Sequence, residues 1–105
     1  MEDRELLEMA AKAGGIMGEY RDGLGICPPE LHQLHKFWWN PLNDSGDAFR
    51  LAVALRLTVK IEDHEIEVFA WGECLVSIDM MGSNYFCFYT RRAIVRAAAI
   101  IGSKK

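Results

Sequence analysis

The sequence contains no long apolar run. No stretch of its 105 residues approaches the roughly 18 consecutive apolar residues of a membrane-spanning helix. The opening stretch MEDRELLEMAAKAGG is acidic and has no apolar core, which is not the pattern of a signal peptide. We therefore expect a protein with no membrane partner, located in the cytoplasm of the cell that makes it.

The sequence also lacks an excess of positive charge. Its formal net charge is −3 at pH 7, whereas a general nucleic-acid binder needs surplus Lys and Arg to neutralise phosphates. This balance argues against that class without excluding a local basic patch. Repeats and low-complexity tracts are absent and half of the residues are hydrophobic, so we expect one globular domain over residues 1–105.

Cysteines are few. The three that are present, at Cys27, Cys74 and Cys87, are odd in number and widely spaced, which indicates free buried thiols in a reducing compartment. Cys27, His32 and His35 come nearest to a metal-site spacing. A zinc site needs three or four convergent ligands, however, and the remaining His64 lies in a predicted turn. We expect neither a metal nor a cofactor.

Enzyme signatures are missing as well. The sequence has no P-loop, no dinucleotide-binding glycine run, no H-E-x-x-H and no G-x-S-x-G. Asp44 and Asp47 resemble a catalytic carboxylate pair, but capping of a predicted helix start explains both of them. We therefore expect a protein that is not an enzyme.

Hydrophobic periodicity predicts three helices. The first covers residues 3–14, with Asp3 as N-cap and the glycines at 14–15 as its end. The second begins near Asp44 or Ser45 and buries Ala48, Leu51, Ala52 and Leu55. The third begins at Thr90 and ends at Gly102. Residues 16–42 show no sustained period and are predicted to form a long surface loop with a short helical turn at 28–35.

Alternating segments between the last two helices predict strands at residues 57–62, 65–71, 74–81 and 84–90. The fold is thus predicted to be α+β, a layered sandwich in which about three helices pack on an antiparallel meander of three to four strands. Ile66 and Val68 should lie on one face of this sheet, with Phe69 and Trp71 on the other. We expect the loop at 16–42 to cover the second face, with another helix or a second subunit as alternatives.

The segments WWNPLNDSGDAFRLAVAL and TRRAIVRAAAIIG resemble small phage and prophage proteins grouped as the phage ABA sandwich domain. The residues that carry the resemblance are Trp39, Asn40, Pro41, Asp44, Asp47, Ala48 and the helix at 90–102, within a stretch that covers roughly residues 37–102. The resemblance implies a phage-encoded accessory protein in the cytoplasm of a host cell, with helices packed on a sheet. It assigns no activity to any residue.

Two adjacent tryptophans precede the second helix. Neighbouring side chains of an extended chain point in opposite directions, so we assign Trp39 to the core and leave Trp38 free to contact a partner. Trp38 could stack on a planar ligand together with Phe37 or Tyr85. The alternative is that these rings serve only packing.

Three arginines lie in the predicted last helix. Arg91 and Arg92 fall in its expected first turn, where the helix dipole disfavours cations unless an anion is bound. Arg96, one turn later, should line the same side as Arg92. The alternative is that they pair with surface carboxylates of Glu62, Glu65, Glu67 or Asp79.

Three functions are compatible with these features. The first is a non-catalytic binder that counters host defence by sequestering a small anionic, nucleotide-type signal, as a homo-oligomer with its pocket between subunits. Its predicted ligand-binding residues are Phe37, Trp38, Tyr85, Arg91, Arg92 and Arg96. The second is a protein–protein module that docks on a host or phage protein through the aromatic loop. The third is a nucleotide hydrolase, the function that the sequence supports least.

Overall fold

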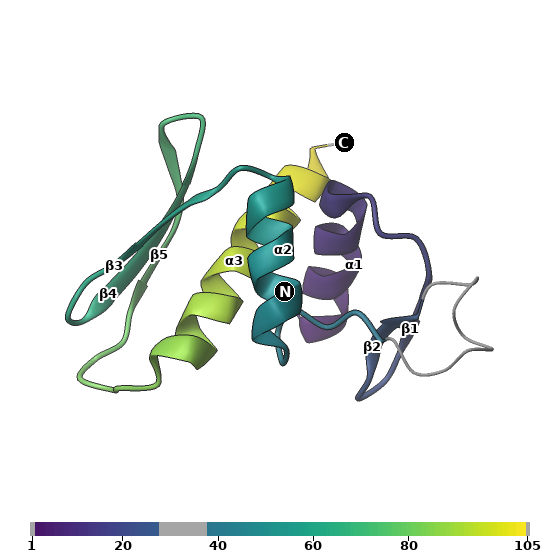
Figure 1. Ribbon diagram of the computed structural model, residues 1–105, viewed down its shortest axis with the longest axis horizontal. Helices are drawn as coiled ribbons and strands as arrows, with labels where there is room; N and C mark the ends of the chain where they lie inside the picture. The colour runs from purple at the N-terminus through teal and green to yellow at the C-terminus, as the bar shows by residue number, and fades with distance from the viewer. Residues whose placement is uncertain (1, 28–37, 105) are drawn as a thin grey trace.

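The computed structural model describes residues 2–27 and 38–104, shown as a coloured ribbon in Figure 1. The helices of this part of the chain are α1 (Asp3–Gly14), α2 (Ser45–Ala54) and α3 (Phe86–Ser103). Its strands are β1 (Glu19–Arg21), β2 (Gly25–Cys27), β3 (Thr58–Ile61), β4 (Glu65–Ala70) and β5 (Glu73–Asp79). The predicted α+β class is confirmed. The main antiparallel sheet has three strands in the order β3-β4-β5, and β1 and β2 form a separate hairpin.

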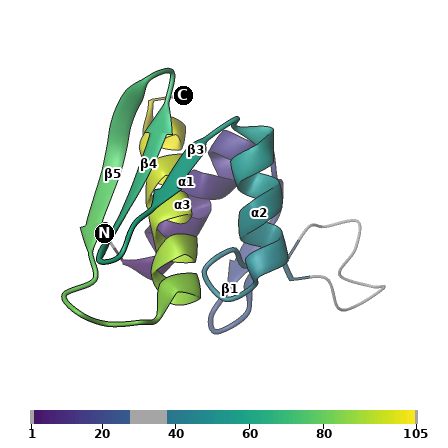
Figure 2. The same ribbon diagram turned by 60° about the vertical axis from the view of Figure 1, so that its left-hand side comes forward.

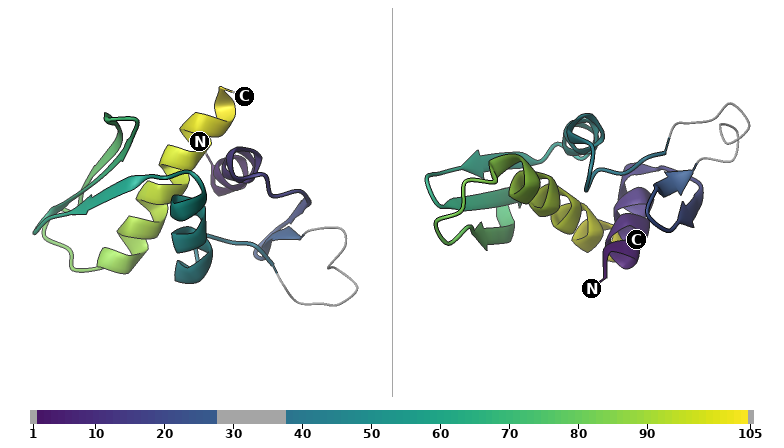
Figure 3. Two further views of the ribbon diagram at one scale, coloured as in Figure 1. Left: turned by 45° about the horizontal axis from the view of Figure 1, so that its top comes forward. Right: turned by 90° about the horizontal axis from the view of Figure 1, so that it is seen from below.

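Helix α3 is the central element. It packs against β4 and β5 on one side and against α1 and α2 on the other. Figures 1 and 3 show α3 between the sheet and α1. Only α3 lies broadly on the sheet, and the other two helices pack mainly on α3.

Small residues let α1 and α3 approach each other closely. Ala10, Ala98 and Ala99 are almost fully buried in this contact region. A Cβ atom added at Gly102 would collide with the backbone carbonyl of Met9. The alanine-rich face of α3 was predicted to permit close packing, and it packs closely against α1. The prediction that Gly102 ends the helix is wrong, because α3 continues to Ser103. Gly102 instead allows the backbones of α1 and α3 to approach each other closely.

The sheet has one apolar face and one polar face. Ile66, Val68 and Ala70 are buried toward α3, while the intervening residues of β4 are only partly buried. The opposite face carries mainly polar side chains, including Lys60 and Glu67, which antiparallel sheets commonly expose to water. The prediction that residues 16–42 cover this face is wrong for their described part, since β1 and β2 pack on α1 instead.

Hydrogen bonds at the start of α2 give Asn40 of the Asn-Pro step and Asp47 of the Asp-Ala step structural roles. The side chain of Asp44 accepts a hydrogen bond from the Asp47 backbone N–H at 2.8 Å, as the predicted cap requires. The Asp47 carboxylate accepts from the backbone N–H of Asn40 at 2.9 Å. The Asn40 amide donates to the Leu24 carbonyl at 3.2 Å. These bonds tie α2 to the β1–β2 hairpin.

Two predicted segments have a different structure. Residues 84–90 are not a fourth strand, because α3 begins at Phe86 and not at Thr90. Phe86 and Tyr89 both pack against the core beneath the sheet, and their spacing of three fits a helix better than a strand. Residues 19–27, predicted as loop, contain the β1–β2 hairpin. The helical turn predicted at 28–35 lies outside the described residues.

The N-terminal cap also differs from the prediction. Glu2, and not Asp3, is the N-cap residue of α1, and its side chain makes no capping bond. The predicted end of α1 is confirmed, because Gly15 adopts a left-handed conformation with φ of 73°. Within the described ranges, no helix has the length and apolarity needed to cross a membrane.

We predict that Gly102→Ala destabilises the protein. In an unstrained helix, a change from Gly to Ala raises the free energy of unfolding by roughly 0.5–1 kcal/mol. Here the added methyl group meets the Met9 backbone, and overpacking of this kind lowers the free energy of unfolding by about 1–3 kcal/mol. Urea denaturation measures the free energy of unfolding. Ser103→Ala, at an exposed neighbouring position, is the control and should change it by less than about 0.5 kcal/mol. A stabilised Gly102→Ala variant would contradict the close crossing.

Candidate functional site

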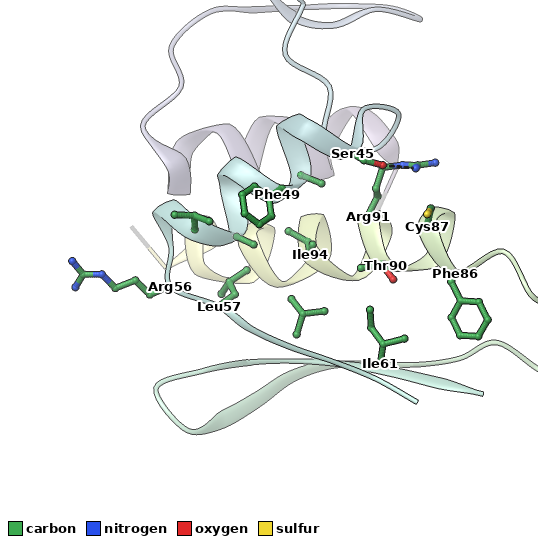
Figure 4. A pocket seen from close by; sticks show the side chains of 14 residues that line it. Ser45, Phe49, Arg56, Leu57, Ile61, Phe86, Cys87, Thr90, Arg91 and Ile94 are labelled. Atoms are coloured by element: carbon green, nitrogen blue, oxygen red, sulfur yellow. Dashed lines mark hydrogen bonds between the residues drawn. The ribbon is translucent and has the colours of Figure 1, made fainter. Parts of the chain in front are cut away.

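An apolar groove with a volume of about 500 Å³ opens between α2 and β3, with α3 as its floor. We call it the α2–β3 groove. Its apolar walls include Phe49 and Val53 of α2, Val59 and Ile61 of β3, and Phe86 and Ile94 of α3. Figure 4 shows Phe49 facing Leu57 and Ile61 across the groove, with Ile94 and Thr90 between them.

The α2 wall of the groove is apolar because α2 carries apolar residues on a second side. Ala48, Leu51 and Ala52 form its buried stripe, as predicted, whereas Leu55, expected in the same stripe, is the C-cap residue and is only partly buried. Phe49 and Val53, four residues apart, lie outside that stripe and remain 68% and 59% exposed. Side chains of this size are seldom grouped at a surface without a partner.

Polar groups are few and sit at defined places. The Arg91 guanidinium donates from Nε to the Leu42 carbonyl at 2.9 Å and from Nη1 to Ser45 Oγ at 3.0 Å. These bonds use two of the five N–H groups that a guanidinium offers. No carboxylate of the described residues forms an ion pair with Arg91, so its charge remains available at this end of the groove.

The hydroxyl of Thr90 adds a second polar feature. Its Oγ1 is buried and has no hydrogen-bond partner. It is the single buried side-chain nitrogen or oxygen without a partner in the described part of the chain. Figure 4 places Thr90 on the groove floor, between Phe86 and Ile94. An unpartnered buried hydroxyl costs the folded protein roughly 1–3 kcal/mol.

Among the described residues that line the groove, the two charged ones are both cationic. Arg91 lies near Ser45 and Cys87 at one end, and Arg56 lies near Leu57 at the other (Figure 4). A mostly apolar hollow with a few convergent polar groups is the usual form of a binding site. This one suits an occupant with an apolar body and a negative charge.

The predicted first-turn placement of the arginine pair is wrong. Because α3 begins at Phe86, Arg91 and Arg92 lie in its second turn, beyond the N–H groups that bind anions. Adjacent helical residues also diverge by about 100°, so the two side chains face different neighbours. Arg91 points toward α2, and Arg92 pairs with Asp3 of α1 at 2.8 Å.

The carboxylates expected as alternative partners are engaged elsewhere. Glu62 and Glu67 each have an oxygen 3.9 Å from the Lys60 amine. Ser77 donates to Glu65 at 3.3 Å, and the Asp79 carboxylate accepts from the Met81 backbone N–H at 2.8 Å. Carboxylate oxygens of these three glutamates lie within 4.8 Å of one another, but the lysine beside them offsets their charge, so we assign no metal to them. His32 and His35 lie outside the described residues. Cys27 is buried, whereas the prediction of buried thiols is wrong for Cys74 and Cys87, which are exposed.

Arg92 and Arg96 share one side of α3, as predicted. They line a shallow hollow of about 410 Å³ together with Leu6, Ala99 and Ile100, which we call the α1–α3 hollow. Arg96 is exposed and has no acidic partner among the described residues. The predicted arginines are therefore divided between two sites.

The predicted aromatic residues do not join either site. Trp39 is partly buried, packs against the core around α1, and exchanges two backbone hydrogen bonds of 2.8 Å with Ile26. Trp38 is also partly buried, and Tyr85 is 70% exposed directly before α3. Neither lines the α2–β3 groove or the α1–α3 hollow. Phe37 lies outside the described residues.

Sequence reasoning missed the main lining residues of the groove. The role of Phe49 and Val53 could have been predicted from the sequence. Two apolar residues at a spacing of four, beside a complete buried stripe, indicate a second contact face on the helix. Because residues 84–90 were predicted to form a strand, Phe86 and Thr90 were not expected on the helix that lines the groove. Comparison of the chain with protein-family models, with curated proteins and with solved structures found no match. The resemblance to phage proteins therefore stays a prediction.

We predict that Thr90→Val stabilises the free protein by about 1 kcal/mol, because it replaces an unpartnered buried hydroxyl by a methyl group of similar volume. Valine and threonine have similar helix propensity, so the difference reports on the hydroxyl. Urea denaturation measures the change. Thr58→Val, on the exposed outer face of the sheet, is the control and should be nearly neutral. A destabilised Thr90→Val variant would show that the hydroxyl has a partner after all.

Proposed function

We propose that this protein is a non-catalytic binding protein that takes an apolar, negatively charged partner into the α2–β3 groove. The observation that supports this best is the coincidence of two features in one hollow: exposed apolar walls and a guanidinium with N–H groups to spare. Each is unfavourable or unused in the free protein, and one occupant would satisfy both.

The lining of the groove favours binding over catalysis. Ser45, Cys87 and Thr90 are its nucleophile-type side chains, and no histidine or carboxylate is among its described lining residues. A serine or cysteine nucleophile needs an adjacent base to act. Ser45 instead accepts a hydrogen bond from Arg91, which does not activate it.

Burial of the exposed walls would supply much of the affinity. Phe49, Val53 and Ile61 are 68%, 59% and 53% exposed. Fully burying a side chain of this type contributes about 1.5–3 kcal/mol, so three of them offset a substantial part of the cost of association.

The biological setting that we propose follows from the resemblance to phage proteins. A small phage-encoded accessory protein can counter host defence by holding a host component without transforming it. The groove supports a nucleotide hydrolase least, because neither a metal cluster nor a base lines it in the described part of the chain.

An aromatic anion tests the groove directly. We predict that anilinonaphthalene sulfonate binds the native protein and that Phe49→Glu weakens this binding at least about tenfold, because a carboxylate then replaces an apolar wall and repels the sulfonate. Fluorescence titration below the melting transition provides the measurement. Phe88→Glu is the matched control, since Phe88 is also exposed on a helix but does not line the groove. Equal binding by both variants would place the dye elsewhere.

A nucleotide-type anion in the α1–α3 hollow is the second candidate function. It is favoured by the convergence of Arg92 and Arg96 beside the apolar side chains of Leu6 and Ile100. Arginine pairs grip phosphate well, and the Asp3 carboxylate now beside Arg92 would be displaced by it.

A panel of cyclic dinucleotides, cyclic trinucleotides and adenosine-diphosphate-ribose derivatives distinguishes this candidate. We predict that a sequestered member raises the melting temperature and is released intact on heating, since ligand at 100-fold its dissociation constant adds about 2.7 kcal/mol. Arg96→Gln should remove the response, and Arg56→Gln, outside the hollow, should preserve it. A chemically altered ligand would contradict a binding role, and silence across the panel would eliminate this second candidate.

A further inference from the structure

The α2–β3 groove runs along a free strand edge. β3 is a terminal strand of the sheet and pairs only with β4 among the described strands. Figure 2 shows β3 as the strand of this sheet nearest to α2. The open side of β3 therefore faces the groove, and its unpaired backbone groups are part of the site.

The register identifies these groups. The Glu62 N–H donates to the Glu65 carbonyl at 2.8 Å, so the even-numbered residues of β3 direct their backbone groups toward β4. Alternation then directs the N–H and C=O groups of Val59 and Ile61 away from β4, toward the groove. The N–H of Leu57 is already engaged, by the Ala52 carbonyl at 2.9 Å.

The other edge of the sheet is different. The pairing of β4 with β5 shifts between Val68 and Phe69, which is the signature of a bulge. Bulges twist an edge away from further pairing and are a common protection against it. β3 is regular through all of its paired residues, so it keeps the geometry that accepts another strand.

We propose that an extended peptide segment of a partner protein adds to β3 as a fourth strand and fills the α2–β3 groove. This inference rests on the proposed function. The segment would bond to Val59 and Ile61 through its backbone and place every second side chain, which would be apolar, against the walls of the groove. An acidic group at its end would reach Arg91.

Charge complementarity selects an acidic segment. The protein carries a net charge of −3, yet both charged residues of the groove, Arg56 and Arg91, are positive and lie at opposite ends. A segment with carboxylates at its ends and apolar residues at alternate positions matches this distribution. Three guanidinium N–H groups of Arg91 remain for such a carboxylate.

A synthetic peptide tests the proposal, acetyl-Glu-Thr-Val-Thr-Val-Thr-Glu-amide, in which the glutamates and the valines share one face of the strand. Its near-symmetry offers an acidic end to Arg91 in either strand direction. Binding is followed by calorimetry and by the alkylation rates of two exposed cysteines. Cys87 lines the groove and Cys74 of β5 does not, so the bound peptide should slow alkylation of Cys87 and leave that of Cys74 unchanged.

Two backbone variants of the peptide provide the decisive comparison. One is N-methylated at its valines and the other at its threonines, with all side chains kept. Strand addition predicts that one of the two binds about tenfold more weakly, the value expected when two ordinary hydrogen bonds are lost. Loss with the valine set indicates antiparallel addition, and loss with the threonine set indicates parallel addition.

The remaining outcomes overturn the inference in distinguishable ways. Equal binding of all three peptides would show an apolar acidic occupant without strand pairing, and would leave the proposed function in place. The same holds if anilinonaphthalene sulfonate binds and no peptide does. A dimer that protects Cys87 without any peptide would assign the groove to a second copy of the chain. If neither dye nor peptide binds, the proposed function fails as well.

Discussion

The close crossing of α1 and α3 is the contact on which the rest of the structure depends. It requires a glycine at 102, because any side chain there would meet the Met9 backbone, and it requires the alanines around it. With α1 held on one side, α3 presents its other sides to the sheet and to α2. The same helix therefore organises the core and forms the floor of the groove, so the site is fixed by the most closely packed part of the molecule.

Arg91 connects this scaffold to the proposed function. Its bonds to the Leu42 carbonyl and to Ser45 hold the start of α2 against α3, while Asn40 and Asp47 hold it to the β1–β2 hairpin. α2 is thus fastened to elements on the side away from β3. Between α2 and β3 the chain supplies a short connection in which the Leu57 N–H bonds to the Ala52 carbonyl, and no side chain of the described residues fills the space along the strand. The groove is the consequence of where α2 is anchored.

Local pattern predicted the elements well where one period dominates. The helix at 3–14, the capped start of α2 and the alternation of Ile66 and Val68 all follow from spacing alone. Residues 84–90 failed because aromatic residues favour strands, while packing of Phe86 and Tyr89 beneath the sheet favours a helix. This shift of four residues moved Arg91 and Arg92 out of the first turn and removed the predicted anion site. The groove itself depends on the separation of α2 from β3, which no local pattern encodes.

Amide hydrogen exchange of β3, followed by NMR in the free protein and with the acidic peptide, tests the central claim most directly. The account predicts that the amides of Val59 and Ile61 exchange quickly in the free protein, while the amide of Lys60, which faces β4, is protected. Addition of the peptide should slow Val59 and Ile61 and leave Lys60 as it was. Protection of Val59 and Ile61 in the free protein, or no change on addition of the peptide, would contradict a groove that receives a partner at the edge of the sheet.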